Sequence, residues 1–131
     1  MRFVCISDTH TLHSRLVVPD GDVLLHAGDF TGIGRLDQVA DFARWLASLP
    51  HQHKVVIAGN HDFAFDEAHP SSGGVPVKQA AEALLRDVPG LTYLRDSGVT
   101  IGSAQLWGSP WQPAYHGWGF NLQRGPEIAA K

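Results

Sequence analysis

The stretch VLLHAGDFTGIGRLDQVADFARWLASLPHQHKVVIAGNHD, residues 23–62, decides the fold that the sequence predicts. Near its two ends, Val23–His26 and Val55–Ala58 are short, mostly apolar runs without polar alternation, which are typical of buried strands in parallel sheets. Between them, residues 36–49 carry apolar side chains at three- and four-residue steps, which indicates an amphipathic helix that Pro50 ends. Strand, helix and strand form the right-handed crossover unit of an α/β sheet.

The regions on either side extend this α/β pattern. A third apolar run precedes the first two, and we expect it to be joined to them by a loop. Downstream we predict one more helix and three short strands, the last two joined as a hairpin at residues 102–103. No repeat or linker divides the chain, so residues 1–131 are predicted to form one domain. The additional predicted elements are a strand at Phe3–Ile6, a helix at Lys78–Val88, and strands at Leu91–Leu94, Val99–Ile101 and Gln105–Trp107.

Composition excludes several classes of function. The formal net charge of −3 provides no basic surface for a nucleic-acid polymer. No apolar stretch approaches the roughly 20 residues that a membrane span requires. Cys5 is the only cysteine and stands in an apolar run, so we expect a buried free thiol, which fits a reducing cytoplasm.

Each of the three buried strands is followed directly by polar residues. These are Asp8 and His10, then Gly28-Asp29, then the segment 59–62, Gly-Asn-His-Asp. Singly, each motif is ordinary turn composition. Because parallel strands end at the same edge of a sheet, the three together favour a shared site there. Carboxylate, imidazole and amide oxygen suit Mn²⁺, Fe or Zn²⁺, so the sequence predicts a metal site.

The sequence around these motifs resembles that of a known family. The segments RFVCISDTH, GDVLLHAGDFTGIG, KVVIAGNHDFAFD, YLRDSGVT and GSPWQPAYHGWGFNLQRG are similar to the MPPED (239FB-like) subgroup of the calcineurin-like metallophosphoesterases. That subgroup is itself similar to class III cyclic nucleotide phosphodiesterases. The resemblance implies the N-terminal part of an αββα sandwich, with a mixed sheet and a parallel βαβ core.

The resemblance also implies a role for each polar residue. Asp8 and His10 would bind the first of two divalent metal ions, Asp29 would bridge both ions, and Asn60 would bind the second. His61 would be catalytic, beside the substrate phosphoryl group. The implied activity is hydrolysis of a phosphodiester, in a cyclic or small nucleotide, by a hydroxide shared between two ions about 3.5–4 Å apart.

The later histidine motifs of the family, Thr-His-Gly-Pro-Pro and Gly-His-x-His, do not occur in this sequence, which ends at RGPEIAAK. We therefore expect this chain to hold at most one metal firmly and to hydrolyse phosphodiesters poorly. We also expect uncovered apolar sheet surface that favours self-association. The alternatives are a non-catalytic nucleotide- or metal-binding module that keeps the fold, and an α/β domain with no metal.

The remaining histidines and the tryptophans have simpler interpretations. His26 lies in a strand and is expected to be a core residue, and His116 is expected at a rim. We expect the other four histidines to be solvated: His13, His51, His53 and His69. Trp111 and Trp118 either bind the substrate by stacking on a base or, with Trp107 and Phe120, cover the edge of the core.

Overall fold

The computed structural model describes all residues from 1 to 131 and contains a four-stranded sheet that is parallel throughout. The strand order is β1-β2-β3-β4, with neighbouring strands in register over three or four residues. Helix α1 (Leu36–Ser48) connects β2 to β3, and helix α2 (Gly74–Arg86) lies between β3 and β4. The α/β prediction is confirmed. The strands are β1 (Phe3–Ile6), β2 (Val23–His26), β3 (His53–Val56) and β4 (Leu91–Tyr93).

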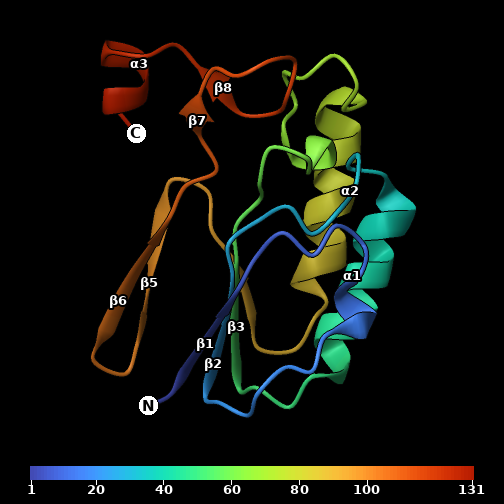
Figure 1. Ribbon diagram of the computed structural model, residues 1–131, viewed down its shortest axis with the longest axis vertical. Coiled ribbons are helices and arrows are strands. Elements are labelled where there is room, and N and C mark those ends of the chain that lie inside the picture. The colour runs from blue at the N-terminus through green and yellow to red at the C-terminus, as the bar shows by residue number, and fades with distance from the viewer.

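Both long helices cover the same face of the sheet (Figure 1). The core lies between the helices and this face. It is centred on aromatic side chains, of which Phe30 and Phe42 stack with ring centroids 4.2 Å apart. The apolar stripe of α1 that the sequence predicts supplies the helical side of this core through Val39, Phe42 and Leu46. Burial of that stripe is what holds α1 against the sheet.

The other face of the sheet is only partly covered. The predicted hairpin forms β5 (Ser97–Ile101) and β6 (Ala104–Gly108), and Figure 1 shows it on the side of the sheet opposite the helices. A second apolar cluster joins the hairpin to β2, β3 and the end of β4, but includes no residue of β1. The remaining elements are short: η1 (His13–Arg15), η2 (Phe63–Phe65), β7 (Gln112–Pro113), β8 (Asn121–Leu122) and α3 (Pro126–Ala129). None of the helices has the length and apolar character needed to cross a membrane.

Four details differ from the sequence-based expectations. Cys5 is exposed, because the hairpin leaves the outer face of β1 bare. His13 is buried between Phe42 and Trp45, with its Nε2 atom 3.0 Å from Asp41 Oδ2. His51 is also buried, with Nε2 3.0 Å from the carbonyl oxygen of Pro19. Both imidazoles have partners distant in sequence, which local polarity does not reveal. Helix α2 also starts at Gly74, earlier than predicted.

Candidate metal centre

Three loops meet at the carboxyl edge of the sheet, as the strand-end motifs predicted. The loops after β1 and β2 stay paired beyond the strands, since the Asp8 amide donates to the Gly28 carbonyl over 2.9 Å and the His10 amide donates to the Asp29 carbonyl over 3.0 Å. The loop after β3 joins them, because the His61 amide donates to Asp29 Oδ1 over 2.8 Å. Two backbone–backbone hydrogen bonds and one from a backbone amide to the Asp29 carboxylate therefore fix the relative position of all three motifs.

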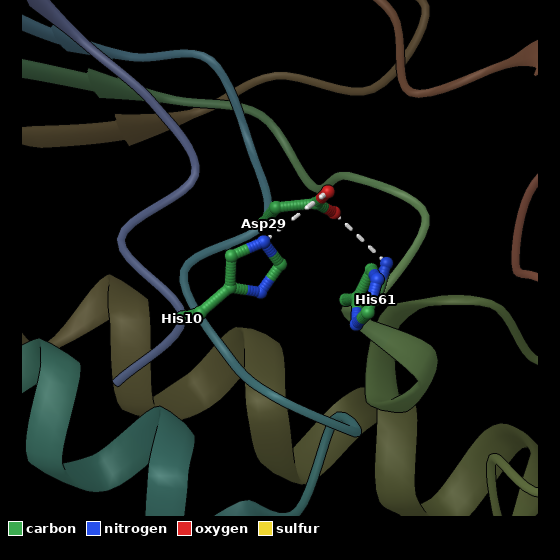
Figure 2. Close-up of side chains that lie close together, drawn as sticks. All are labelled: His10, Asp29 and His61. Atoms are coloured by element: carbon green, nitrogen blue, oxygen red, sulfur yellow. Dashed lines mark hydrogen bonds and ion pairs between the residues drawn. The ribbon is translucent and has the colours of Figure 1, made fainter. Parts of the chain in front are cut away.

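These loops bring His10, Asp29 and His61 together (Figure 2). One ligand atom from each lies within 4.8 Å of the others, and all three side chains are half-buried. His10 Nε2 lies 4.0 Å from Asp29 Oδ2, and the two imidazole rings meet edge to face with centroids 4.6 Å apart. Two imidazoles and a carboxylate form a donor set that suits Zn²⁺, Fe or Mn²⁺ and leaves further coordination positions open.

The two imidazoles are held in the tautomer that a metal ligand needs. His10 Nδ1 lies 3.1 Å from the Thr31 carbonyl oxygen, and His61 Nδ1 lies 2.8 Å from the Gly32 carbonyl oxygen. A carbonyl oxygen only accepts hydrogen bonds, so each Nδ1 carries the proton and each Nε2 keeps its lone pair. Both Nε2 atoms are therefore available to a cation. The sequence had left these two backbone partners unidentified.

Asp8 and Asn60 lie next to this triad but are placed differently. The Asp8 side chain is exposed, its backbone is left-handed (φ +54°), and its carboxylate falls outside the group of mutually close ligands. Asn60 directly precedes His61, and its backbone carbonyl accepts the Gly119 amide over 2.9 Å. The predicted roles of Asp8 and Asn60 as ligands, and of His61 as the catalytic residue, stay predictions.

Positive φ angles concentrate in these turns. His10, Thr11 and Asp29 are left-handed as well as Asp8, although none of them is glycine. Such conformations cost of order 1–3 kcal/mol each and persist where the surrounding structure enforces them. The hydrogen bonds between the loops supply that enforcement, so the strain is located at the candidate centre.

Asp62 joins the loops after β2 and β3 through hydrogen bonds, a role that the sequence did not predict. Its carboxylate is fully buried and accepts the amides of Asp29, Gly59 and Thr31 over 2.8–2.9 Å, together with the Thr31 hydroxyl over 2.6 Å. Burial raises the pKa of Asp62 to about 6, although the hydrogen bonds from Thr31 and Gly59 act in the opposite direction. The only signal in the sequence was its position at the end of the segment 59–62.

Gly28 and Gly59 allow the second and third loops to touch. A Cβ atom on Gly28, whose φ is +96°, would lie 2.7 Å from the Gly59 amide nitrogen. A Cβ atom on Gly59 would collide with both the carboxylate and the amide of Asp29. The glycines that looked like ordinary turn composition are therefore required by close backbone approach.

His26 ties the first two loops together from inside the core, as expected for a core histidine. The Gly28 amide donates to its Nδ1 over 3.3 Å, so Nε2 carries the proton and donates to the Thr9 hydroxyl over 3.1 Å. Burial lowers the pKa of His26 to about 4. The imidazole is thus neutral in the folded protein at neutral pH.

This neutral histidine predicts a specific pH dependence of stability. Below its ordinary pKa of 6.5, His26 takes up a proton in the unfolded chain but not in the folded one. The free energy of unfolding therefore decreases as the pH falls from about 6.5 to about 4. The loss amounts to about 3 kcal/mol. Asp62 acts with the opposite sign, because its raised pKa makes the folded state bind a proton first.

A comparison with His26→Gln separates the two effects. The stability advantage of the wild type over this variant should shrink by about 3 kcal/mol between pH 7 and pH 4, since Asp62 contributes equally to both proteins. Urea unfolding at both pH values, with a chelator present, measures it. An advantage that is the same at both pH values would contradict the assignment.

The aromatic residues near the C-terminus divide into two groups. Trp118 stacks on His61, with ring centroids 4.1 Å apart. Trp111 instead donates its indole N–H to Asp96 over 2.8 Å, and the guanidinium of Arg95 lies 5.4 Å from its ring centre. Phe120 is fully buried and Trp107 is exposed on the hairpin. Of the two tryptophans predicted to bind substrate, only Trp118 contacts the triad.

Comparison with known proteins identifies the family of this chain. The family model described as calcineurin-like phosphoesterase matches residues 1–118. Metallophosphoesterase domain-containing protein 1 of Homo sapiens is 42% identical over 144 residues, an alignment that covers 99% of this chain and 43% of that protein. UPF0046 protein C25E10.12 of Caenorhabditis elegans is 41% identical over 140 residues, covering 100% of this chain and 48% of that protein.

This chain spans less than half the length of these relatives. The resemblance of its strand-end motifs to the calcineurin-like and MPPED group is confirmed by both kinds of match. Its triad is also a donor set that fits the divalent metal on which this family depends. The chain belongs to the calcineurin-like phosphoesterase family.

Proposed function

We propose that this protein hydrolyses phosphodiester bonds in small molecules, using divalent metal ions held at the carboxyl edge of the sheet. The observation that carries the proposal is the convergence of His10, Asp29 and His61, with hydrogen bonds from both imidazoles made through Nδ1 so that both Nε2 atoms stay free. Bound metal ions, in proteins of this chemistry, lower the pKa of water and neutralise charge on the phosphoryl oxygens. Membership of the family makes a hydrolase the first hypothesis.

The proposed ligand sets follow the motifs. Asp8, His10 and Asp29 would hold one ion, and Asp29 with Asn60 would contribute to a second. Asp29 is suited to bridging because only one of its oxygens accepts the His61 amide, while the other faces His10. We propose Mn²⁺ first among Mn²⁺, Fe and Zn²⁺, because the carboxylates of Asp8 and Asp29 and the amide oxygen of Asn60 are the oxygen donors that suit it. We further propose that this chain alone retains at most one ion firmly.

His61 is proposed to act on the substrate itself. Its ring is held by the Gly32 carbonyl on one side and lies between His10 and Trp118. One ring nitrogen of His61 lies within 4.8 Å of an Asp29 carboxylate oxygen. From there, once Nε2 has taken up a proton to form the imidazolium, the residue would stabilise phosphoryl charge or protonate the leaving oxygen.

The substrate is proposed to be a cyclic or other small nucleotide. Trp118 supports this choice, because its indole lies against His61 at the candidate centre. Trp118→Ala should weaken nucleotide binding while leaving the metal content unchanged, since it provides stacking area but no ligand atom. Trp107→Ala is the matched control on the exposed hairpin. Equal affinity in all three proteins would remove Trp118 from the substrate site.

A metal-binding module without turnover is the second candidate. It is favoured by the same triad, whose imidazoles and carboxylate would still bind a metal if hydrolysis had been lost. The cytoplasm is the proposed compartment for either function, because an exposed free thiol such as Cys5 fits a reducing environment.

Hydrolysis of bis-p-nitrophenyl phosphate, with Mn²⁺ or with a chelator, distinguishes the candidates. The proposed enzyme hydrolyses it only with metal, and Asp29→Ala abolishes that activity while Asp87→Ala does not. Asp87 is a suitable control because it is exposed and its side chain makes no hydrogen bond. Calorimetric Mn²⁺ binding without hydrolysis would identify the module. A protein that neither binds metal nor hydrolyses the ester would refute both.

A further inference from the structure

Two amide hydrogen bonds hold the backbone just after Trp118. The Gly119 amide donates to the backbone carbonyl of Asn60 over 2.9 Å. The Phe120 amide donates to Asp66 Oδ2 over 2.8 Å, and Asp66 is buried. Both acceptors belong to the segment that follows β3, so the chain after the indole is fixed to the same segment that contains the third strand-end motif.

His69 makes the corresponding contact just before Trp118. The Ser71 amide donates to its Nδ1 over 3.1 Å, so Nε2 carries the proton and donates to the Gly117 carbonyl over 2.8 Å. The imidazole also stacks on Phe63, with ring centroids 4.0 Å apart and planes inclined by only 9°. The ring is therefore fixed through both of its nitrogens and through one face.

These contacts determine where the indole of Trp118 lies. The backbone is hydrogen-bonded on both sides of this residue, and its ring stacks on His61 with centroids 4.1 Å apart and planes inclined by 28°. The Gly117 carbonyl accepts no hydrogen bond other than the one from His69, and the Gly117 amide makes none. Loss of the imidazole would therefore free the backbone just before the indole.

We propose that His69 is a positioning residue that holds Trp118 against His61. It acts through the Gly117 carbonyl. The hydrogen bond from His61 Nδ1 to the Gly32 carbonyl fixes one direction in the imidazole, and the stacked indole fixes the plane of the ring. Together the two contacts set the direction of Nε2. The catalytic consequence rests on the proposed function of His61 in hydrolysis, whereas the position of its ring does not.

NMR spectra of the His61 ring protons, recorded at fixed pH with a chelator present, test the position without any activity. A stacked indole shifts these resonances upfield, and Trp118→Ala should remove the shift. His69→Asn should remove most of it as well, because the shorter amide does not reach the Gly117 carbonyl. His69→Gln should retain the shift, since its amide nitrogen can replace the imidazole Nε2 as donor.

The control is His53→Asn, which changes a half-buried histidine at the start of β3 whose side chain makes no hydrogen bond. It should leave the His61 resonances in place. Wild-type resonances in His69→Asn would overturn the proposal. Equal losses in His69→Asn and His69→Gln would also overturn it, because the hydrogen bond to Gly117 would then not be the link.

Hydrolysis of bis-p-nitrophenyl phosphate with Mn²⁺ tests the catalytic consequence. His69→Asn should lower kcat about tenfold, with unchanged Mn²⁺ affinity, because His69 contributes no atom to the triad. In the Trp118→Ala background the same substitution should have no further effect, since His69 acts through the indole. An additive loss in the double variant would contradict the proposal. A wild type without hydrolysis would refute the proposed function alone, and the NMR comparison would then decide the role of His69.

Discussion

Replacing Asp62 with alanine is expected to lower the free energy of unfolding by roughly 5 kcal/mol and to abolish metal binding. The substitution leaves three buried amides and one hydroxyl without their acceptor, at about 2 kcal/mol each. Removing a buried charge offsets part of this loss, because burial raises the pKa of Asp62 to about 6. The lost hydrogen bonds outweigh the relieved charge.

Urea unfolding and calorimetry with Mn²⁺ measure the two effects of Asp62→Ala. Asp87→Ala is the control, since its carboxylate is exposed and makes no hydrogen bond. Domains of this size are stable by only about 5–15 kcal/mol, so Asp62→Ala stands near the limit of folding. The milder Asp62→Asn keeps one acceptor oxygen, so its loss of stability should be smaller and measurable. Wild-type stability and metal affinity in Asp62→Ala would show that this carboxylate does not organise the loops.

Replacing Gly59 with alanine is expected to reduce metal affinity by about 100-fold, with a smaller loss of stability, about 2 kcal/mol. The added methyl group would occupy the position of the Asp29 carboxylate, so this ligand and the loop that carries it must move. Asp29 is the residue that faces both His10 and the loop after β3. A single methyl group should therefore disable the centre, although Gly59 itself supplies no ligand.

Gly117→Ala is the matched control for Gly59→Ala, because a Cβ atom at Gly117 meets nothing within 4 Å. Calorimetric titration with Mn²⁺ and thermal unfolding should distinguish the two alanine variants clearly. If Gly59→Ala and Gly117→Ala bound metal equally well, the close packing of the second and third loops would not be what positions Asp29.

The elements of the fold were predictable from local patterns. The helix α1 and the strands β1, β2 and β3 follow from apolar spacing, and the hairpin β5–β6 follows from two short apolar runs around Gly102-Ser103. Local patterns failed where a partner lies far along the chain. His13 looked solvated because it stands among polar residues, yet Phe42 and Trp45 bury it.

The candidate centre was likewise predictable only where local patterns sufficed. Strand-end motifs placed Asp8, His10, Asp29, Asn60 and His61 at one edge, because parallel strands end together. They carried no information on which side chains point toward one another, since that depends on backbone angles in the turns. The left-handed conformations of Asp8 and Asp29, both non-glycine, illustrate the problem. Residue spacing also did not predict the role of Asp62 or the two carbonyls that fix the imidazole tautomers.

The sequence by itself determined the parallel α/β architecture, the edge on which the polar residues gather and the family, because periodicity and motif order are local properties of the chain. The tertiary structure alone decided that His10, Asp29 and His61 form the close triad, that Asp62 supports it and that the outer face of β1 is bare. The physical reason is that burial, hydrogen-bond partners and close approach are relations between distant segments. Such relations exist only once the sheet has brought those segments together.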